Sequence, residues 1–332
     1  MLFQLIRRVY CRCHHTINLP ANQEKREFLF SLKFYLFAIL RPMTNLAFTL
    51  IIFSSVMHAL WNLLVKQSHH KTVFIWWMFV SSGLMFSLLL LLLRQPIPVP
   101  DSRVLFMALG GGCCFALYHL LTGRAYASGD ISLTYPLCQT SMLYVPLWGM
   151  LLMHEKLSLI GVSGIALVAL GAYSVQLQKF TLNELLRPFR NLREPSVRFA
   201  LAAGFVYSFG VMFDKAGVQI YSPLYFTWLM VFIMFTLMSV NLLRGRYKGK
   251  VTAEWQANWK LILMSGPILM ASFIAFRYGL KMSPVSYAVP VRQVSILFGV
   301  LIGMIFLKES YGRIRLGSAA LILVGAFLIK FG

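Results

Sequence analysis

The chain has 332 residues, of which 58% are hydrophobic and only 12% are charged, with a mean hydropathy of +0.71. Soluble domains carry about 25% charged residues, so this composition excludes an ordinary soluble protein and predicts an integral membrane protein. The formal net charge is +21, and a strongly basic chain can be a nucleic-acid binding protein. Here, however, the basic residues lie in short connections between apolar segments, as the residues that set membrane topology do. We therefore expect no nucleic acid among its partners.

Residues 1–42 form a basic N-terminal segment that differs from the rest of the chain. They hold seven of the 31 basic residues and only two acids. The apolar piece Phe28–Leu40 is interrupted by Lys33 and is shorter than the roughly 20 residues that cross a bilayer. The segment is either an interfacial amphipathic helix or a mis-assigned start, because Met43 opens MTNLAFTLIIF just before the first long apolar segment. We expect the mature protein to start at Met43.

Ten apolar segments follow Met43, most of them close to membrane-spanning length. They cover residues 45–65, 72–93, 104–122, 131–153, 158–176, 199–214, 222–243, 261–278, 284–307 and 314–331. Long runs without two-residue alternation suit helices and not barrel strands. The sequence therefore predicts an all-α integral membrane protein with ten transmembrane helices. Lys66, Asp214 and Lys215 fall at span ends, where we expect interfacial anchors.

The two halves of the chain repeat each other. A shift of 154 positions gives 14 identities among the 44 residues from Ser132 to Val175. The identical pairs include Pro136 with Pro290, Gln139 with Gln293, Gly149 with Gly303, Glu155 with Glu309 and Gly171 with Gly325. At the front of each half, HALWNLLVK (residues 58–66) matches YSFGVMFDK (residues 207–215) more weakly, at a shift of 149.

This repeat divides the chain into a first five-helix unit at 45–177, a basic loop at 178–198 and a second five-helix unit at 199–331. Because five is odd, the second unit enters the membrane from the opposite side, which predicts two inverted five-helix repeats. Folds of this kind bind their substrate near the midplane, between the repeats, and line the site with broken helices.

The positions of the basic residues predict the orientation of the chain. Outside residues 1–42 and apart from Arg292, the connections after odd-numbered spans hold 16 basic residues and the opposite side holds seven, with Lys215 and Arg277 among the seven. The positive-inside rule then places both termini outside the cytoplasm. We expect the bacterial inner, or plasma, membrane as the location.

The tandem repeat also carries a family resemblance. HALWNLLVK in the first span, P-x-x-Q in the fourth, PVRQVSILFGV in the ninth and the tails HEKLSLIGVSGIALVALGAY and KESYGRIRLGSAALILVGAF resemble the EamA family of the drug/metabolite transporter superfamily. The resemblance covers about residues 45–330. It implies a transporter, and not an enzyme, for amino acids, sugars, nucleotide sugars or other metabolites.

Arg292 is the foremost candidate for substrate binding. Its repeat counterpart is Cys138, so the scaffold does not require a cation here, and ionisable residues inside spans are functional candidates by default. The helix-breaking Pro290, with its counterpart Pro136, cannot donate a backbone hydrogen bond and frees a carbonyl in the preceding turn. Arg292 then either holds a carboxylate or phosphate through its planar fork or is a structural arginine bonded to freed carbonyls.

Other polar side chains are candidates for lining the same pathway. Gln139 and Gln293 are related by the repeat and serve either as pathway residues or as interhelical hydrogen bonds. His58, Trp61 and Asn62 in the first span form either a substrate wall or a packing cluster. The third span adds Tyr118 and His119 with the same two interpretations. Glu155 and Glu309 end their spans, where a carboxylate favours the N-terminus of the following helix.

The sequence therefore predicts a secondary transporter that moves a small polar or anionic metabolite by alternating access, and we expect export. No P-loop is present, so a gradient or an exchange supplies the energy. A channel-like pore and a membrane-embedded enzyme of lipid or metabolite processing are the alternatives, although no HExxH, GxSxG or paired intramembrane acids occur. We expect neither a metal nor another cofactor: CRCHH at residues 11–15 lacks the second ligand pair of a zinc site. The expected partners are a small-molecule substrate and the lipid bilayer, and a homodimer is left open.

Overall fold

The structure is a computed structural model, and it describes most of the chain after Pro42. The described residues are 43–94, 96–128, 137–175, 192–242, 249–299 and 313–332, with single positions at 134, 177, 181, 183, 190, 245 and 247. The predictions for residues 1–42, Pro136, Gly303 and Glu309 lie outside the described residues.

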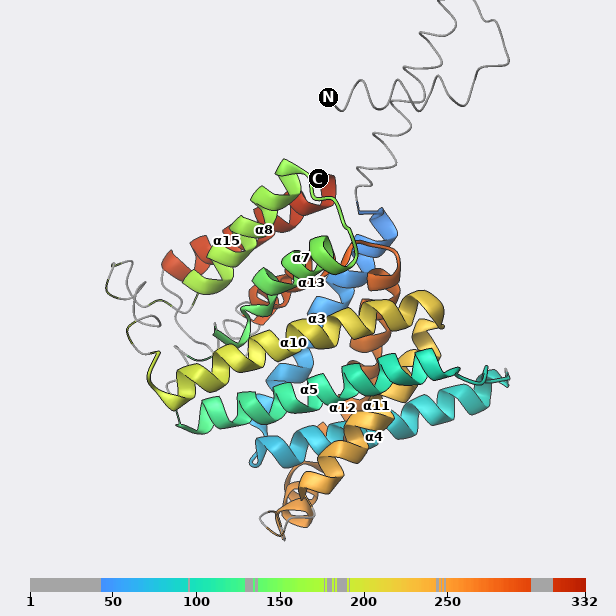
Figure 1. Cartoon of the computed structure of the whole chain (residues 1–332). Coiled ribbons are helices and arrows are strands. Elements are labelled where there is room, and N and C mark those ends of the chain that lie inside the picture. Colours follow the sequence, from blue (N-terminus) through green and yellow to red (C-terminus); the bar gives the residue numbers. More distant parts are fainter. Residues whose placement is uncertain are drawn as a thin grey trace, which may run out of the picture. The chain divides into compact units, whose positions relative to one another are not determined.

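Every regular element in the described residues is an α-helix (Figure 1). The elements that match the first predicted repeat are α3 (Asn45–Gln67), α4 (Lys71–Leu93), α5 (Ser102–Ser128), α7 (Ser141–Leu152) and α8 (Leu159–Ser174). Those that match the second are α10 (Pro195–Ile220), α11 (Pro223–Leu242), α12 (Lys250–Lys281), α13 (Val285–Arg292) and α15 (Arg313–Phe331).

Seven of these helices, namely α3, α4, α5, α10, α11, α12 and α15, are long and apolar enough to cross a membrane. The chain is therefore a multi-pass membrane protein. Helices α7, α8 and α13 cover the predicted fourth, fifth and ninth spans but have only 12, 16 and 8 residues. At 1.5 Å per residue, none of the three alone reaches across about 30 Å of hydrocarbon.

Short polar side chains start several of the helices. Thr44 Oγ1 accepts a hydrogen bond from Ala47 N at 3.2 Å before α3, and Ser158 Oγ accepts one from Gly161 N at 2.9 Å before α8. Asp101 Oδ1 accepts one from Val104 N at 2.8 Å, and this bond is the main reason that the pKa of Asp101 is lowered from its ordinary value. These contacts satisfy N–H groups that have no partner within their own helix.

Helices α10 and α12 extend well beyond the spans that the sequence indicates. Helix α10 runs to Ile220, so the predicted end of the sixth span at 214 is wrong, and Asp214 and Lys215 lie buried within the helix. Helix α12 begins at Lys250, with a non-helical break at Asn258 before the apolar part that we predicted. In both cases polar residues stopped the apolar run in the sequence without stopping the helix.

The contacts between helices follow the same pattern in both halves. Helix α5 packs against α10, and its counterpart α12 packs against α3; α7 likewise packs against α10 and α13 against α3. Helix α8 lies beside its own counterpart α15, and α7 lies beside α13 (Figure 1). Exchanging the two halves therefore leaves the set of neighbours largely unchanged.

Close contacts at glycines between α8 and α15 show the same equivalence of the two halves. A Cβ added to Gly325 would lie 2.6 Å from the Gly164 carbonyl oxygen, and one added to Gly171 would lie 2.7 Å from the Ser318 carbonyl oxygen. Gly171 matches Gly325 in the repeat, and Gly164 matches Ser318. The two close approaches are thus the same contact made twice, and both need a residue without a side chain.

Candidate functional site

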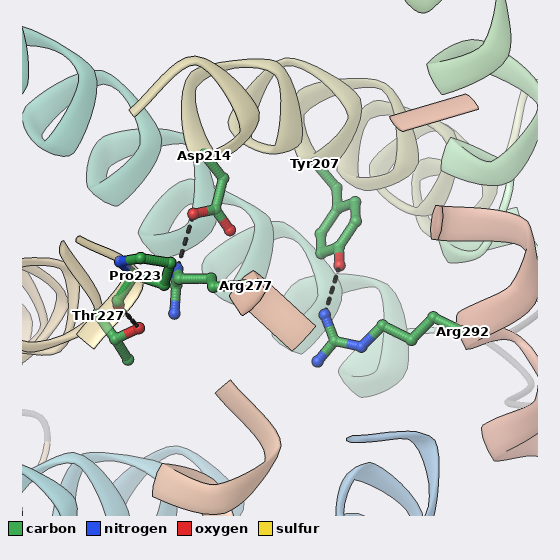
Figure 2. Close-up of polar contacts among 6 residues, drawn as sticks. All are labelled: Tyr207, Asp214, Pro223, Thr227, Arg277 and Arg292. Carbon is green, nitrogen blue, oxygen red and sulfur yellow. Dashed lines mark hydrogen bonds and ion pairs between the residues drawn. The ribbon is translucent and has the colours of Figure 1, made fainter. Parts of the chain in front are cut away.

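Arg292 ends α13 and reaches into the space between three other helices. Its Nη2 lies 3.1 Å from His58 Nδ1 on α3. Its Nη1 donates a hydrogen bond of 3.5 Å to Tyr207 Oη on α10 (Figure 2). Its Cζ also lies 4.0 Å from the ring centroid of Phe276 on α12, a geometry that favours a cation on the ring face. An arginine can only donate hydrogen bonds, so His58 Nδ1 accepts and the histidine proton is on Nε2.

The local sequence explains why α13 ends at this arginine. Pro290 lacks an N–H, so the carbonyl of Ser286 loses its usual helical partner. The chain turns at Gln293, whose N–H donates to the Pro290 carbonyl at 3.0 Å, and helix resumes from Val294 to Gly299. The Arg292 carbonyl accepts a hydrogen bond of 3.2 Å from Ser55 Oγ. The predicted helix break is therefore present, but it follows Arg292, and the carbonyl freed by Pro290 belongs to Ser286, near the opposite end of α13.

Two buried N–H donors in this cluster have no hydrogen-bond partner. They are Arg292 Nε and Trp61 Nε1. The other buried side-chain polar atoms without a hydrogen-bond partner in the described part of the chain are Ser82 Oγ and Thr122 Oγ1. Trp61 as a whole residue is 8% exposed, and its ring meets the His58 ring edge-on with centroids 4.7 Å apart. A buried donor left without an acceptor costs about 1–3 kcal/mol, so this site favours a ligand that brings acceptor atoms.

Aromatic rings of α5 and α10 extend the cluster. Tyr207 lies 4.9 Å from Tyr118 and 5.2 Å from Phe115, measured between ring centroids. His119 lies next to Tyr118 in the chain but faces Phe79 of α4, with centroids 6.2 Å apart. Of the predicted residues, the structure thus brings together Arg292, His58, Trp61 and Tyr118, with His119 beside them.

The remaining predicted residues lie apart from the guanidinium. Asn62 is exposed and donates a hydrogen bond of 2.8 Å to the His58 carbonyl of its own helix. Gln139 and Gln293 both occupy the turn that interrupts their helix, so the repeat places a glutamine at each break. Within the described residues, neither glutamine side chain is hydrogen-bonded to Arg292. Pro136 lies outside the described residues.

A buried ion pair lies beside this cluster and was not predicted. Arg277 Nε on α12 lies 2.7 Å from Asp214 Oδ1 on α10, and the two side chains are 4% and 2% exposed (Figure 2). Lys215 Nζ donates to the carbonyls of Leu280 and Ser283 at 2.8 and 2.7 Å. The prediction that Asp214 and Lys215 are interfacial anchors, and that Arg277 is a loop charge, is therefore wrong. All three have polar partners across the contact between α10 and the C-terminal end of α12, which lowers the cost of burial.

The N-terminus of α13 is held by the first half of the chain. Val285 N donates to Glu155 Oε1 at 2.7 Å and Ser286 N to Glu155 Oε2 at 3.0 Å. Ser158 N donates to Tyr287 Oη at 3.0 Å. We predicted that Glu155 would favour the helix that follows it, but Ser158 caps that helix and Glu155 caps α13 instead. A carboxylate at the N-terminus and a guanidinium at the C-terminus both suit the dipole of this short helix.

No group of three metal-ligating side chains occurs among the residues that the structure describes. Cys138, the counterpart of Arg292, is buried within the fourth predicted span. The residues of CRCHH lie outside the described range.

Comparison with known proteins gives a family and a fold. The family model described as "EamA-like transporter family" matches residues 45–176 and again residues 195–331. Among solved structures, one titled "Crystal structure of protein" has a TM-score of 0.66 at 15% sequence identity, covering 85% of this chain and 96% of that one; at this identity the likeness shows the fold alone. No curated protein matches the chain.

Proposed function

Because the chain belongs to the EamA-like transporter family, we propose that it is a secondary transporter that moves a small polar or anionic metabolite by alternating access. The predicted family resemblance is confirmed, and with it the coarse function of a membrane transporter. The substrate, the direction, which we propose to be export, and the mechanism belong to the proposal. So do the ten spans, the inverted relation of the repeats and the domain limits given above.

One observation carries the proposal: the half-buried Arg292 guanidinium is contacted by His58 of the first repeat and by Tyr207 of the second. These two residues match each other in the repeat. A substrate held at such a point touches both halves, so rocking one half against the other changes the side from which it is reached.

The charge of Arg292 also supports a substrate role. Among the described residues no carboxylate pairs with it directly, because Asp214 is bonded to Arg277, Glu155 to α13, and Glu254 to the start of α4 through His69 N and His70 N. A half-buried cation whose Nε is fully buried and which has no anionic partner is costly. An anionic or strongly polar substrate offsets that cost when it binds, which favours the functional interpretation of Arg292 over the structural one.

The proposed orientation gains support from the buried cations. Lys215 and Arg277 are 7% and 3% exposed and so are not loop charges. Without them the poorer side holds five basic residues against 16, which strengthens the bias that places both termini outside the cytoplasm. We propose the bacterial plasma membrane as the location.

The test begins with metabolite profiling of cells that lack or overproduce the protein, and the compounds that change in opposite directions are then assayed with purified protein in vesicles. Saturable flux supports the transporter, and flux that does not saturate supports the channel-like alternative. Chemical conversion of the compound would support the membrane-embedded enzyme.

A further inference from the structure

We propose that the substrate of the Arg292 cluster is an organic monoanion that carries one carboxylate on a planar apolar body and has no ammonium group. This proposal rests on the proposed function, since it names the class of molecule that the same site accepts. The charges, the hydrogen-bond donors and the aromatic rings around the guanidinium support it.

The charge of the cluster matches one negative charge. Arg292 supplies a single positive charge, and the two nearby cations are already engaged, Arg277 by Asp214 and Lys215 by two backbone carbonyls. A dianion would therefore bury one negative charge without a partner, which is unfavourable in a site of low dielectric constant. A monoanion leaves the cluster neutral.

The cluster has two buried N–H donors without partners and a third N–H on the histidine between them, a set that suits a carboxylate. Arg292 Nε and Trp61 Nε1 are buried N–H groups without acceptors, and His58, whose Nδ1 already accepts from Arg292, has its proton on Nε2. His58 touches both other residues, so the three donors belong to one cluster. A carboxylate has about four lone-pair positions on two oxygens and accepts from several donors at once.

A substrate ammonium group finds no carboxylate in this part of the structure. Of the acids in the described residues, Asp214, Glu155 and Glu254 are bonded as given above, Asp101 caps α5, and Glu194 is exposed at the start of α10. A zwitterionic amino acid would therefore bury its ammonium group without an ionic partner. We infer that the site discriminates against it.

The remaining surroundings are aromatic. Phe276 lies against the guanidinium, and Tyr207, Tyr118 and Phe115 form a contiguous set of rings on α10 and α5. Rings of this kind pack well against a flat apolar group and gain from offset or edge-on contacts. A short aliphatic acid such as acetate fills none of this surface.

The experiment measures binding to the purified full-length protein in lipid nanodiscs by isothermal titration calorimetry. The probes are benzoate, acetate, benzamide, phenylalanine, phthalate and inorganic phosphate. Benzoate is expected to bind at least about tenfold more tightly than each of the others, because each lacks the apolar body, lacks the charge, or adds an unpaired charge. Phthalate, phosphate or phenylalanine binding as tightly as benzoate, or no binding of benzoate at all, overturns the proposed substrate class.

Two tryptophan variants make the test specific to the donor. Trp61→Phe keeps a ring beside His58 but removes the N–H, and it should weaken benzoate binding about tenfold. Trp76→Phe is the matched control, because Trp76 Nε1 on α4 donates to Ser239 Oγ at 2.8 Å and lies outside the cluster. Equal benzoate affinity in both variants contradicts the role of Trp61.

Failure of the substrate class and failure of the proposed function give different results. If another anion binds more tightly than benzoate and its binding is lost in Arg292→Lys, the class is wrong but the anion site remains. If no anion shows any dependence on Arg292 in a protein whose melting temperature is unchanged, the proposed site itself is wrong.

Discussion

His58 and Tyr207 occupy matching positions of the two repeats, and their side chains contact opposite terminal nitrogens of the same guanidinium, that of Arg292. The repeat supplies the two positions, while the residue types differ. The site therefore has a symmetric frame and an asymmetric chemistry: an acceptor nitrogen from the first half and a phenol from the second. Arg292 completes the site, and the first repeat has Cys138 at the equivalent position.

The arginine is the first residue to test. Arg292→Lys keeps the charge but loses the planar fork and the Nε donor, so transport should fall at least about tenfold. Arg292→Ala should abolish it. Arg103→Lys is the control, because Arg103 is exposed and pairs with Asp101 at the start of α5. Undiminished vesicle flux in Arg292→Ala would make the arginine structural.

The two partners of Arg292 should differ in their contribution. Tyr207→Phe removes a long hydrogen bond of 3.5 Å but keeps the ring contacts with Tyr118 and Phe115, so KM should rise only a few-fold. His58→Ala removes the shorter contact and the support of Trp61, and its effect should be larger. Initial rates over a range of substrate concentrations measure both, and the reverse order would contradict the geometry.

The ion pair between Asp214 and Arg277 should contribute to stability. Asp214→Asn leaves a buried guanidinium without its counter-charge, and breaking a pair of this kind costs about 3–5 kcal/mol. Thermal unfolding in detergent should show a clear loss, and the double variant Asp214→Asn with Arg277→Gln should recover part of it. A single variant as stable as the wild type would mean that the pair is not formed.

Loss of the Glu155 cap on α13 should affect substrate binding, because Arg292 ends the same short helix. Glu155→Gln removes the charge and one acceptor, so the N–H groups of Val285 and Ser286 lose part of their cap, at about 1 kcal/mol. We expect lower thermal stability together with weaker substrate binding, because Arg292 is at the other end of the same eight-residue helix. Glu194→Gln is the control, since Glu194 is exposed and makes no side-chain cap of α10. Equal melting temperatures and affinities for the two variants would contradict the account.

The start and orientation of the chain make a separate prediction. Peptide mass spectrometry of the mature protein should find no peptide from residues 1–42, and detection of such peptides would refute a start at Met43. A reporter that is active only in the cytoplasm, fused after Gly332, should remain inactive. Activity of that fusion would refute the outside placement of the C-terminus.

The sequence predicts the positions of the helices and the repeat better than the contacts of the buried polar side chains. Apolar length located the long helices. The repeat identified Gly171 and Gly325, and each of these glycines makes a close contact of its own between α8 and α15. The glutamines at the breaks in the fourth and ninth segments also came from the repeat. Each of these features depends on local sequence or occurs in both repeats, so it can be predicted without a structure.

Contacts between distant segments could not be predicted in the same way. Asp214 interrupts an apolar run in the sequence. Its partner Arg277 lies 63 residues later in the chain, so the sequence alone does not show that Asp214 is buried inside a helix that continues past it. Tyr207 was visible as the counterpart of His58, and that symmetry was the signal that could have identified it. Glu155 was correctly expected near a helix N-terminus, but which helix depends on how the halves pack.

The most direct test of the central claim is flux through purified protein in vesicles, with the metabolite identified by profiling, compared between wild type and Arg292→Lys. We predict that wild-type flux saturates with concentration, accelerates when unlabelled substrate is present on the opposite side, and falls at least about tenfold in the variant. Flux that does not saturate and is equal in the two proteins would contradict both alternating access and the anion site at Arg292.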